Sequence, residues 1–237
     1  MGETYKNLSL RLKTVADMVT KDYKIADIGT DHGFVPISLI ERKMIPFAIA
    51  MDVNQGPLEI AKDNITRAGL TDKIEVRQSD GFENLKPDEV DCAVIAGMGG
   101  NLIIKILYEQ LQVTRSLKEC IIQPQSEWKK MRGFLLEHNF AIIQEELVKD
   151  AGKYYLMMKV TANKPERDWN EVELAFGKLL IEHKNPVLLE YLQKEVNIKE
   201  GILEQLKEES GEHIEERKKE VSSEIKLLRR GLEYYHD

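Results

Sequence analysis

The order of strand-like and helix-like segments is the feature that most restricts how this chain can fold. Five short apolar runs, most of them followed by an amphipathic stretch, lie between residues 25 and 138. Two more strand-like runs, 140–148 and 154–160, follow, and the link between them is too short for a helix and suits a hairpin. Strands that alternate with helices pair in parallel. We therefore expect an α/β, Rossmann-like sheet of seven strands whose last strand is antiparallel.

Periodicity and turn residues bound these segments. The strand-like runs before the hairpin are rich in small and β-branched apolar residues and lie at 25–28, 46–53, 73–77, 89–96 and 119–123. The amphipathic stretches have apolar residues three and four positions apart and lie at 9–19, from 34 onward, and at 56–68, 101–111 and 127–138. Ser9 is the predicted N-cap of the leading helix.

The composition changes after Pro165, where strand-forming residues become rare and Glu, Lys and Leu dominate. Two blocks of apolar residues at helical spacing predict two antiparallel helices with Glu208-Glu209-Ser210-Gly211 between them and a shorter helix, 171–183, before them. One uninterrupted helix is the alternative, because a glycine costs a helix only about 1 kcal/mol relative to alanine. We expect a sheet domain at 1–163 and a C-terminal helical hairpin or coiled-coil domain at 164–237.

Other sequence features argue against several kinds of protein. The chain has no apolar run long enough to span a membrane, and its first residues lack the apolar core of a signal peptide. We therefore expect a cytoplasmic protein that has no membrane partner. Cys92 and Cys120 lie in apolar strand-like runs, which predicts buried reduced thiols. No Cys and His spacing typical of a metal site occurs, so we expect no metal.

The formal charge of −7 opposes a simple nucleic-acid-binding surface. Residues 1–163 carry 21 basic and 23 acidic side chains, and residues 164–237 carry 13 and 18, so neither part is basic. A nucleic-acid partner would need a local patch. The candidate cations for such a patch are Arg11, Lys13, Lys129, Lys130, Arg132, Arg217, Lys218, Lys219, Arg229 and Arg230.

The segment after the first strand has the residues of a nucleotide-binding loop. Gly29 and Gly33 allow a close backbone approach, and the next helix begins with unpaired amide donors. Asp27, Asp52 and Asp80 stand at the carboxyl ends of three successive strands, where ligands bind in doubly wound sheets. A carboxylate at 52 can accept hydrogen bonds from both ribose hydroxyls, and one at 80 can accept a hydrogen bond from an adenine amino group.

The first loop also indicates which adenosine cofactor fits. A dinucleotide fold needs G-x-G-x-x-G, whereas this loop has Asp27-x-Gly29-x-x-x-Gly33 with Asp31 in the middle. A carboxylate there repels a diphosphate but suits the positive charges of S-adenosylmethionine. The closing hairpin favours the same cofactor. A nicotinamide-dependent oxidoreductase is the competing hypothesis from another class.

Several motifs together resemble one family. The chain is similar to class I S-adenosylmethionine-dependent methyltransferases, and more narrowly to the bacterial tRNA (adenine-N1)-methyltransferases that act at position 22. The motifs that carry this resemblance are LSLRL, ADIGTDHGFVP, RQSDG, AGMGGNLI, IIQPQ and, in the helical tail, EHKNPVLLEYL. The resemblance spans nearly the whole chain, and it implies S-adenosyl-L-methionine as cofactor and tRNA as substrate. We expect a monomer or a weak homodimer.

The resemblance also implies roles for individual residues. Asp31 and Arg11 match positions implied in catalysis or in handling tRNA. The implied cofactor-binding residues are Asp27, Gly29, Thr30, Gly33, Asp52, Val53, Asp80, Gly81, Gly97 and Met98. The implied substrate-binding residues are His32, Gly99, Gly100, Gln123, Pro124 and Gln125. Gln125 departs from the asparagine expected in a Q-P-N turn.

The expected chemistry asks mainly for alignment. The AGMGG turn replaces the N/D-P-P-Y/F tetrapeptide expected for methylation of an amino group, which favours attack by a ring nitrogen. Adenine N1 already carries a lone pair, so the reaction needs proximity more than a strong base. We expect Asp31 to orient the exocyclic amino group, or else only to brace the turn with His32. A methyltransferase for another RNA base and a non-catalytic cofactor-binding adaptor are the alternatives.

Overall fold

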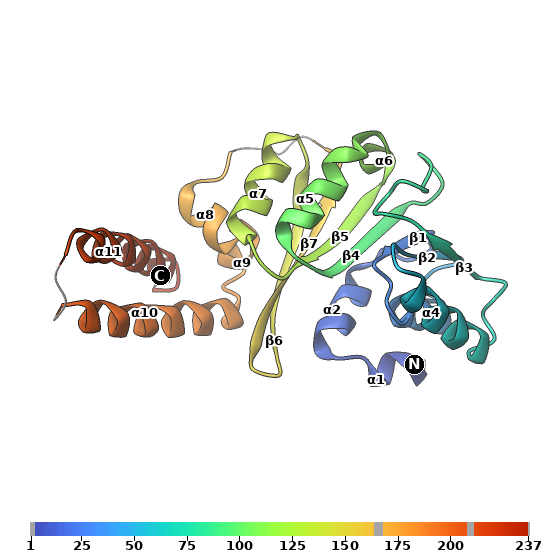
Figure 1. Ribbon diagram of the computed structural model, residues 1–237, viewed down its shortest axis with the longest axis horizontal. Helices are drawn as coiled ribbons and strands as arrows, with labels where there is room; N and C mark the ends of the chain where they lie inside the picture. Colours follow the sequence, from blue (N-terminus) through green and yellow to red (C-terminus); the bar gives the residue numbers. More distant parts are fainter. Residues whose placement is uncertain (1–2, 164–167, 208–210, 237) are drawn as a thin grey trace. The chain divides into compact units, whose positions relative to one another are not determined.

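The computed structural model describes residues 3–163, 168–207 and 211–236. The chain forms two compact units, Met1–Asp168 and Trp169–Asp237 (Figure 1). The predicted domain boundary between 163 and 164 adjoins residues 164–167, which lie outside the described residues, and it stays a prediction.

The first unit contains a seven-stranded sheet in the order β3-β2-β1-β4-β5-β7-β6. Its strands are β1 (Ile25–Ile28), β2 (Ala48–Asp52), β3 (Ile74–Gln78), β4 (Cys92–Met98), β5 (Glu119–Pro124), β6 (Ala141–Asp150) and β7 (Lys153–Thr161). Strands β3, β2, β1, β4 and β5 pair in parallel, and β7 is antiparallel to both β5 and β6. The predicted seven-stranded sheet with one antiparallel strand is confirmed.

Helices pack on this sheet in two groups (Figure 1). The first group comprises α1 (Glu3–Asn7), α2 (Leu10–Met18), α3 (Phe34–Glu41) and α4 (Gln55–Arg67), and the other three helices each contact α3. The second comprises α5 (Gly100–Glu109), α6 (Leu111–Ser116) and α7 (Trp128–Glu137), with α5 in contact with both of its partners. The predicted Ser9 cap is confirmed, because its hydroxyl accepts a hydrogen bond from the Leu12 amide at 3.3 Å.

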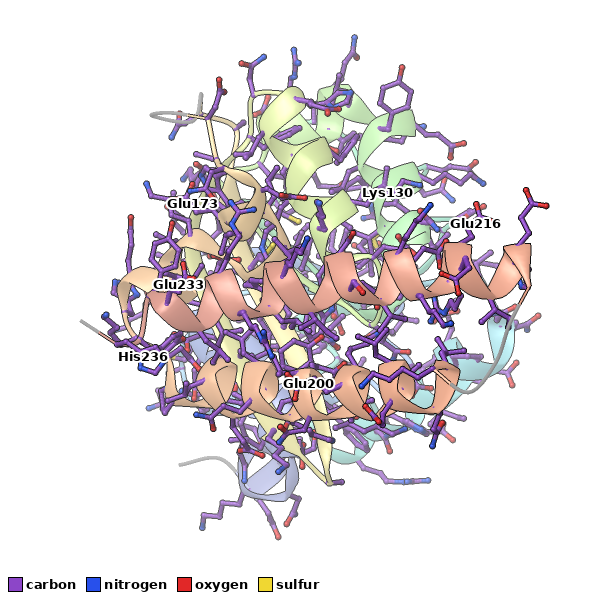
Figure 2. All side chains as sticks on the ribbon, turned by 90° about the vertical axis from the view of Figure 1, so that its left-hand side faces the viewer. Lys130, Glu173, Glu200, Glu216, Glu233 and His236 are labelled. Carbon is purple, nitrogen blue, oxygen red and sulfur yellow. The ribbon has the colours of Figure 1, made fainter. Side chains whose placement is uncertain are left out.

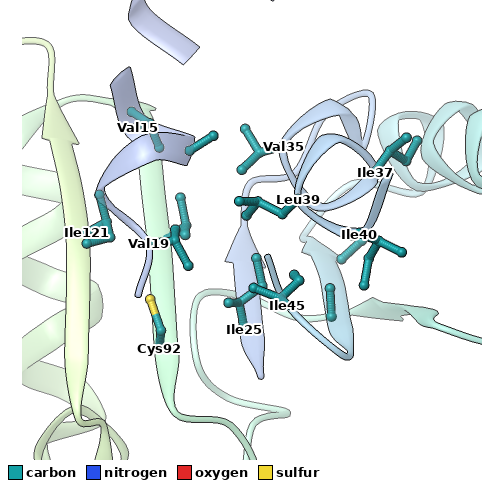
Figure 3. Close-up of a cluster of buried hydrophobic side chains, with 14 of the residues drawn as sticks. Val15, Val19, Ile25, Val35, Ile37, Leu39, Ile40, Ile45, Cys92 and Ile121 are labelled. Carbon is teal, nitrogen blue, oxygen red and sulfur yellow. The ribbon is translucent and has the colours of Figure 1, made fainter. Parts of the chain in front are cut away.

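The core lies between the central strands and the first group of helices (Figure 3). Val15 and Val19 at the end of α2 and Leu39 from α3 meet Ile25 of β1 and Ile121 of β5 there. Every residue of β1, β2 and β5 is buried, as expected of parallel strands covered on both faces. Cys92 and Cys120 are buried free thiols, as predicted, and burial raises the pKa of both.

Two predicted boundaries are wrong for identifiable reasons. Strand β4 begins at Cys92 rather than at Glu89, because the Glu89 carboxylate pairs with Arg77 at 2.7 Å and accepts a hydrogen bond from the Lys86 amide, which fixes a turn there. The predicted helix 171–183 is broken into α8 (Glu171–Phe176) and α9 (Lys178–Glu182) by Gly177, whose φ is +96°. The short helices α1 and α6 were not predicted.

The second unit ends in two long helices, α10 (Pro186–Leu206) and α11 (Glu212–Glu233), which pack side by side (Figure 2). Asn185 caps α10 by accepting hydrogen bonds from the amides of Val187 and Leu188. The buried residues along the pair are Leu188, Leu192, Val196, Val221, Ile225, Leu228 and Gly231. The prediction of two helices, rather than one uninterrupted helix, is therefore confirmed. The predicted turn residues 208–210 lie outside the described residues.

None of the helices in the described ranges combines the length and apolar character that crossing a membrane requires.

One ion pair is buried in the first unit. Arg132 of α7 donates to Glu145 of β6 at 2.8 Å, and the two side chains are 1% and 0% exposed. Arg132 was a candidate for a surface patch of cations, and that expectation is wrong, because its position in α7 faces β6 rather than solvent. Removal of one partner from such a pair leaves an uncompensated buried charge.

We expect Glu145→Ala to lower the free energy of unfolding by about 3–5 kcal/mol, and the double variant Arg132→Met/Glu145→Leu to cost clearly less, because it removes both charges. Urea denaturation followed by circular dichroism measures the difference. Glu137→Ala, at an exposed position of α7, is the control and should stay within about 0.5 kcal/mol of the unmodified protein. An equal loss in the single and double variants would show that packing, rather than charge, sets the cost.

Candidate active site

The loop after β1 is tied to the neighbouring strand β2. The amides of Gly29 and Thr30 both donate to the carbonyl oxygen of Met51, at 2.8 and 2.9 Å. Gly29, Asp31 and Gly33 all have positive φ, at +70°, +52° and +72°. These left-handed residues turn the chain sharply, so that α3 begins directly above the end of β1.

The two glycines of this loop face other parts of the protein. A Cβ on Gly29 would collide with the methyl group of Met98, and a Cβ on Gly33 would lie 3.4 Å from that of Ala61 in α4. The sequence predicted close approach of a ligand at both glycines. The structure shows a Met98 side chain against the first and a helix against the second, and neither contact could be read from the spacing.

Asp27 is a buried carboxylate beneath this loop. It is 5% exposed and accepts a hydrogen bond from the Thr30 hydroxyl at 2.7 Å. Burial raises the pKa of Asp27 from its ordinary value near 3.8 to about 6, the Thr30 hydrogen bond opposes this rise, and the negative charge of Asp52 adds to it. An ionised Asp27 is thus poorly compensated by the protein, and a nearby cation would stabilise it.

Asp52 and Asp80 lie at the ends of the next two strands. Asp52 is 9% exposed and accepts the Asn54 amide with one carboxylate oxygen at 2.9 Å. Its carbonyl oxygen accepts the Ser79 amide at 2.9 Å, which joins the loops after β2 and β3. Val53 and Asp80 are exposed, while Gly81 is buried against Ile106 of α5. The three carboxylates therefore stand at the strand ends, as the sequence predicted.

Asp31 and His32 project from the first loop. The Asp31 side chain is 68% exposed and lies 3.5 Å from His32 Nε2, and the His32 side chain is 43% exposed. The His32 ring stacks on Phe34 with centroids 5.3 Å apart and an angle of 17° between the planes. Asn64 of α4 donates to the His32 carbonyl oxygen at 2.9 Å, which holds the loop. An exposed pair of this kind is weak, so Asp31 is accessible to a ligand.

Arg11 reaches the same edge of the sheet from the start of α2. Its Nη1 donates to Gln123 Oε1 at 2.9 Å, and its main-chain amide donates to Asp150 Oδ2 at 3.0 Å. The guanidinium also lies over the Tyr155 ring, 5.6 Å from its centroid. Sequence reasoning found Arg11 and Gln123 but missed Asp150 and Tyr155, which come from the closing hairpin.

The turns after β4 and β5 interlock. The Gln125 amide donates to the Met98 carbonyl oxygen at 2.8 Å, and the Gly100 amide donates to the Ser126 hydroxyl at 3.3 Å. A Cβ on Gly100 would collide with the Ser126 carbonyl oxygen. Any residue other than glycine at this position would force one of the two turns to move. The AGMGG and QPQ segments are therefore tightly packed against each other. Ser126 was not predicted as part of the site.

The described cations of the C-terminal helices are largely paired. Arg217 and Lys218 form ion pairs within α11, with Glu220 at 2.8 Å and Glu215 at 2.7 Å. Arg229 pairs with Glu200 of α10 at 2.6 Å, and Arg230 pairs with Glu171 of α8 at 3.1 Å. These helices therefore present a mixed surface of charges rather than a row of cations (Figure 2).

Comparisons with known proteins place this chain in a family. A family model described as tRNA (adenine(22)-N(1))-methyltransferase matches residues 25–230. The tRNA (adenine(22)-N(1))-methyltransferase of Bacillus subtilis is 31% identical over 96% of this chain and 98% of that protein.

Two solved structures extend the comparison. Streptococcus pneumoniae Sp1610 in complex with S-adenosyl-L-methionine is 32% identical, with a TM-score of 0.85 over 95% of this chain and 99% of that one. M. capricolum TrmK in complex with S-adenosyl-homocysteine is 31% identical, with a TM-score of 0.84 over 96% and 98%. The family model and the Bacillus subtilis relative indicate the same family. This chain belongs to the tRNA (adenine(22)-N(1))-methyltransferase family.

Proposed function

We propose that this protein transfers the methyl group of S-adenosyl-L-methionine to N1 of adenine 22 in tRNA. One observation carries the proposal: two buried carboxylates, Asp27 and Asp52, and an accessible one, Asp31, lie at the carboxyl edge of the sheet in a chain whose residues 25–230 match this family. Acidic groups at this edge disfavour a dinucleotide and suit a cationic cofactor.

The residues present fit that cofactor. Asp27 would receive the ammonium group, because its buried charge has little compensation from the protein. Asp52 accepts the Asn54 amide with one carboxylate oxygen, and the other would accept a hydrogen bond from a ribose hydroxyl. Asp80 would accept from the adenine amino group. The remaining residues that we assign to the cofactor lie in the loops after β1, β2 and β3 and at the end of β4: Gly29, Thr30, Gly33, Val53, Gly81, Gly97 and Met98.

The cofactor supplies a methyl group on a positively charged sulfur. The protein would supply orientation, since adenine N1 is itself the nucleophile. Asp31 would accept a hydrogen bond from the exocyclic amino group and stabilise the positive charge that develops on the base as N1 is methylated. His32 and Phe34 offer an accessible stacked pair of rings beside Asp31. Stacking on aromatic rings offsets part of the cost of removing a base from the tRNA.

The rest of the proposed substrate site comes from the interlocked turns. Gly99 and Gly100 follow Met98 at the end of β4, and Pro124 and Gln125 lie at the end of β5, where the Gln125 amide donates to the Met98 carbonyl oxygen. We further propose that the protein works in the cytoplasm, without metal, as a monomer or weak homodimer, and that the helices of residues 164–237 form a separate domain that contacts tRNA.

A direct assay tests the activity. Incubation with labelled S-adenosylmethionine and total tRNA from a strain that lacks the gene should label 1-methyladenosine, mapped to position 22 by nuclease digestion and mass spectrometry. Label on another base would support the alternative substrate. Binding of S-adenosyl-homocysteine without any transfer to such tRNA would support the adaptor.

The proposed role of Asp31 can be separated from bracing of the turn. Asparagine adopts positive φ readily, so Asp31→Asn keeps the turn and removes only the charge. We expect methyl transfer to fall at least about tenfold, with the affinity for S-adenosyl-homocysteine unchanged by calorimetry. Asp22→Asn is the matched control, because Asp22 is an exposed aspartate with φ of +67° ahead of β1. Normal turnover in Asp31→Asn would refute the assignment.

The raised pKa of Asp27 predicts pH-dependent cofactor binding. The ionised carboxylate is the form that pairs with an ammonium group, so the affinity should rise as the pH rises through about 6 and then level off. Between pH 5 and pH 7 we expect about a tenfold gain in affinity for S-adenosyl-homocysteine by calorimetry. Asp27→Asn should bind more weakly at pH 7 and lose the dependence. A flat profile in the unmodified protein would argue against contact with Asp27.

A further inference from the structure

Gln123 lies at the carboxyl end of β5, fully buried. We propose that Gln123 is a positioning residue for methyl transfer: its single carboxamide oxygen holds both the Arg11 guanidinium and the Gly97 amide, and thereby fixes the charge of Arg11 against the turn after β4. This inference rests on the proposed function and gives Gln123 an indirect role, in place of the direct substrate contact expected from the sequence.

The orientation of the carboxamide is determined by its neighbours. Gln123 Oε1 accepts from Arg11 Nη1 at 2.9 Å and from the Gly97 main-chain amide at 3.0 Å. Both partners can only donate. If the carboxamide were flipped, its NH₂ group would face two donors, so the oxygen must point to them.

The nitrogen end of the same carboxamide faces no acceptor that the structure describes. Gln123 is 0% exposed, and its Nε2 has no hydrogen-bond partner among the described residues. A buried donor without an acceptor costs free energy. An apolar side chain of similar size would avoid that cost, so what glutamine provides at this position is the oxygen that joins Arg11 to Gly97.

Close packing reinforces this arrangement. Gly97 has a φ of +80°, and a Cβ built on it would lie 3.4 Å from Arg11 Nη1. The guanidinium therefore packs directly against the backbone of the turn. On its other sides Arg11 is held by Asp150 through its main-chain amide and by the ring of Tyr155. Among the described hydrogen bonds of Arg11, only the one to Gln123 Oε1 links its side chain to the segment that leads into Met98 and Gly99. The link exists because the same oxygen also accepts the Gly97 amide.

A fixed guanidinium has a clear use in this position. Its remaining N–H groups are donors for an acceptor atom of the docked nucleotide, a phosphate oxygen or a ring nitrogen. Because side-chain entropy opposes each such contact, a pre-oriented arginine binds more tightly and aligns better than a free one. Loss of the Gln123 oxygen would leave Arg11 charged, but its guanidinium would no longer be held in one orientation.

A double-mutant cycle tests the inference. Gln123→Met removes the acceptor at similar volume, and Gln123→Asn shortens the side chain so that its oxygen cannot hold both donors. In each variant we expect kcat/KM for tRNA to fall at least about tenfold, with binding of S-adenosyl-homocysteine within about twofold of normal. In the Arg11→Ala background, the same changes should cost less than about twofold, because the residue through which Gln123 acts is already absent.

The controls separate this proposal from others. Gln144→Met, at a half-buried glutamine of β6, should leave activity and binding unchanged. Full activity in both Gln123 variants, or losses that multiply with that of Arg11→Ala, would overturn the positioning role. Gln123→Asn keeps the test available if Gln123→Met fails to fold. An unmodified protein without activity on tRNA would instead contradict the proposed function.

Discussion

The central strands of the sheet have no face that water can reach, and this constraint organises the rest of the first unit. All residues of β1, β2 and β5 are buried. Helices must then cover both faces, so the polar groups of these strands can meet a ligand only at their ends. The carboxyl ends are where Asp27, Asp52 and the loop with Asp31 are found. The location of the site thus follows from the way in which the sheet is buried.

Burial also decides how the carboxylates differ. Asp27 and Asp31 are four residues apart in the chain, yet one is buried beneath the loop and the other is exposed above it. A buried ionised group is destabilised unless a counter-charge lies nearby, whereas an exposed ionised group is stabilised by water. Aspartate therefore suits both proposed roles: contact with a cationic cofactor at position 27 and contact with the target adenine at position 31.

Local patterns in the sequence predicted much of the fold. The alternation of segments, the hairpin and the Ser9 cap depend on near neighbours in the chain, and these expectations are confirmed. Contacts between distant residues could not be predicted. The bond from Arg11 to Gln123 joins residues 112 positions apart, and Arg132 resembled a solvated residue until its pairing with Glu145 was known. The strand ends located the acidic residues of the candidate site, but the sequence contained no signal for Asp150, Tyr155 or Ser126.

The paired cations of the C-terminal helices have a consequence for any encounter with RNA. Arg217, Lys218, Arg229 and Arg230 each have a carboxylate partner within the protein. Cations that bind phosphates displace condensed counterions, and this release makes affinity fall as salt rises. A cation that must first leave its own carboxylate gains less from that release, and added salt weakens the internal pair as well. Binding through these helices would therefore depend on salt less steeply than their number of basic residues implies.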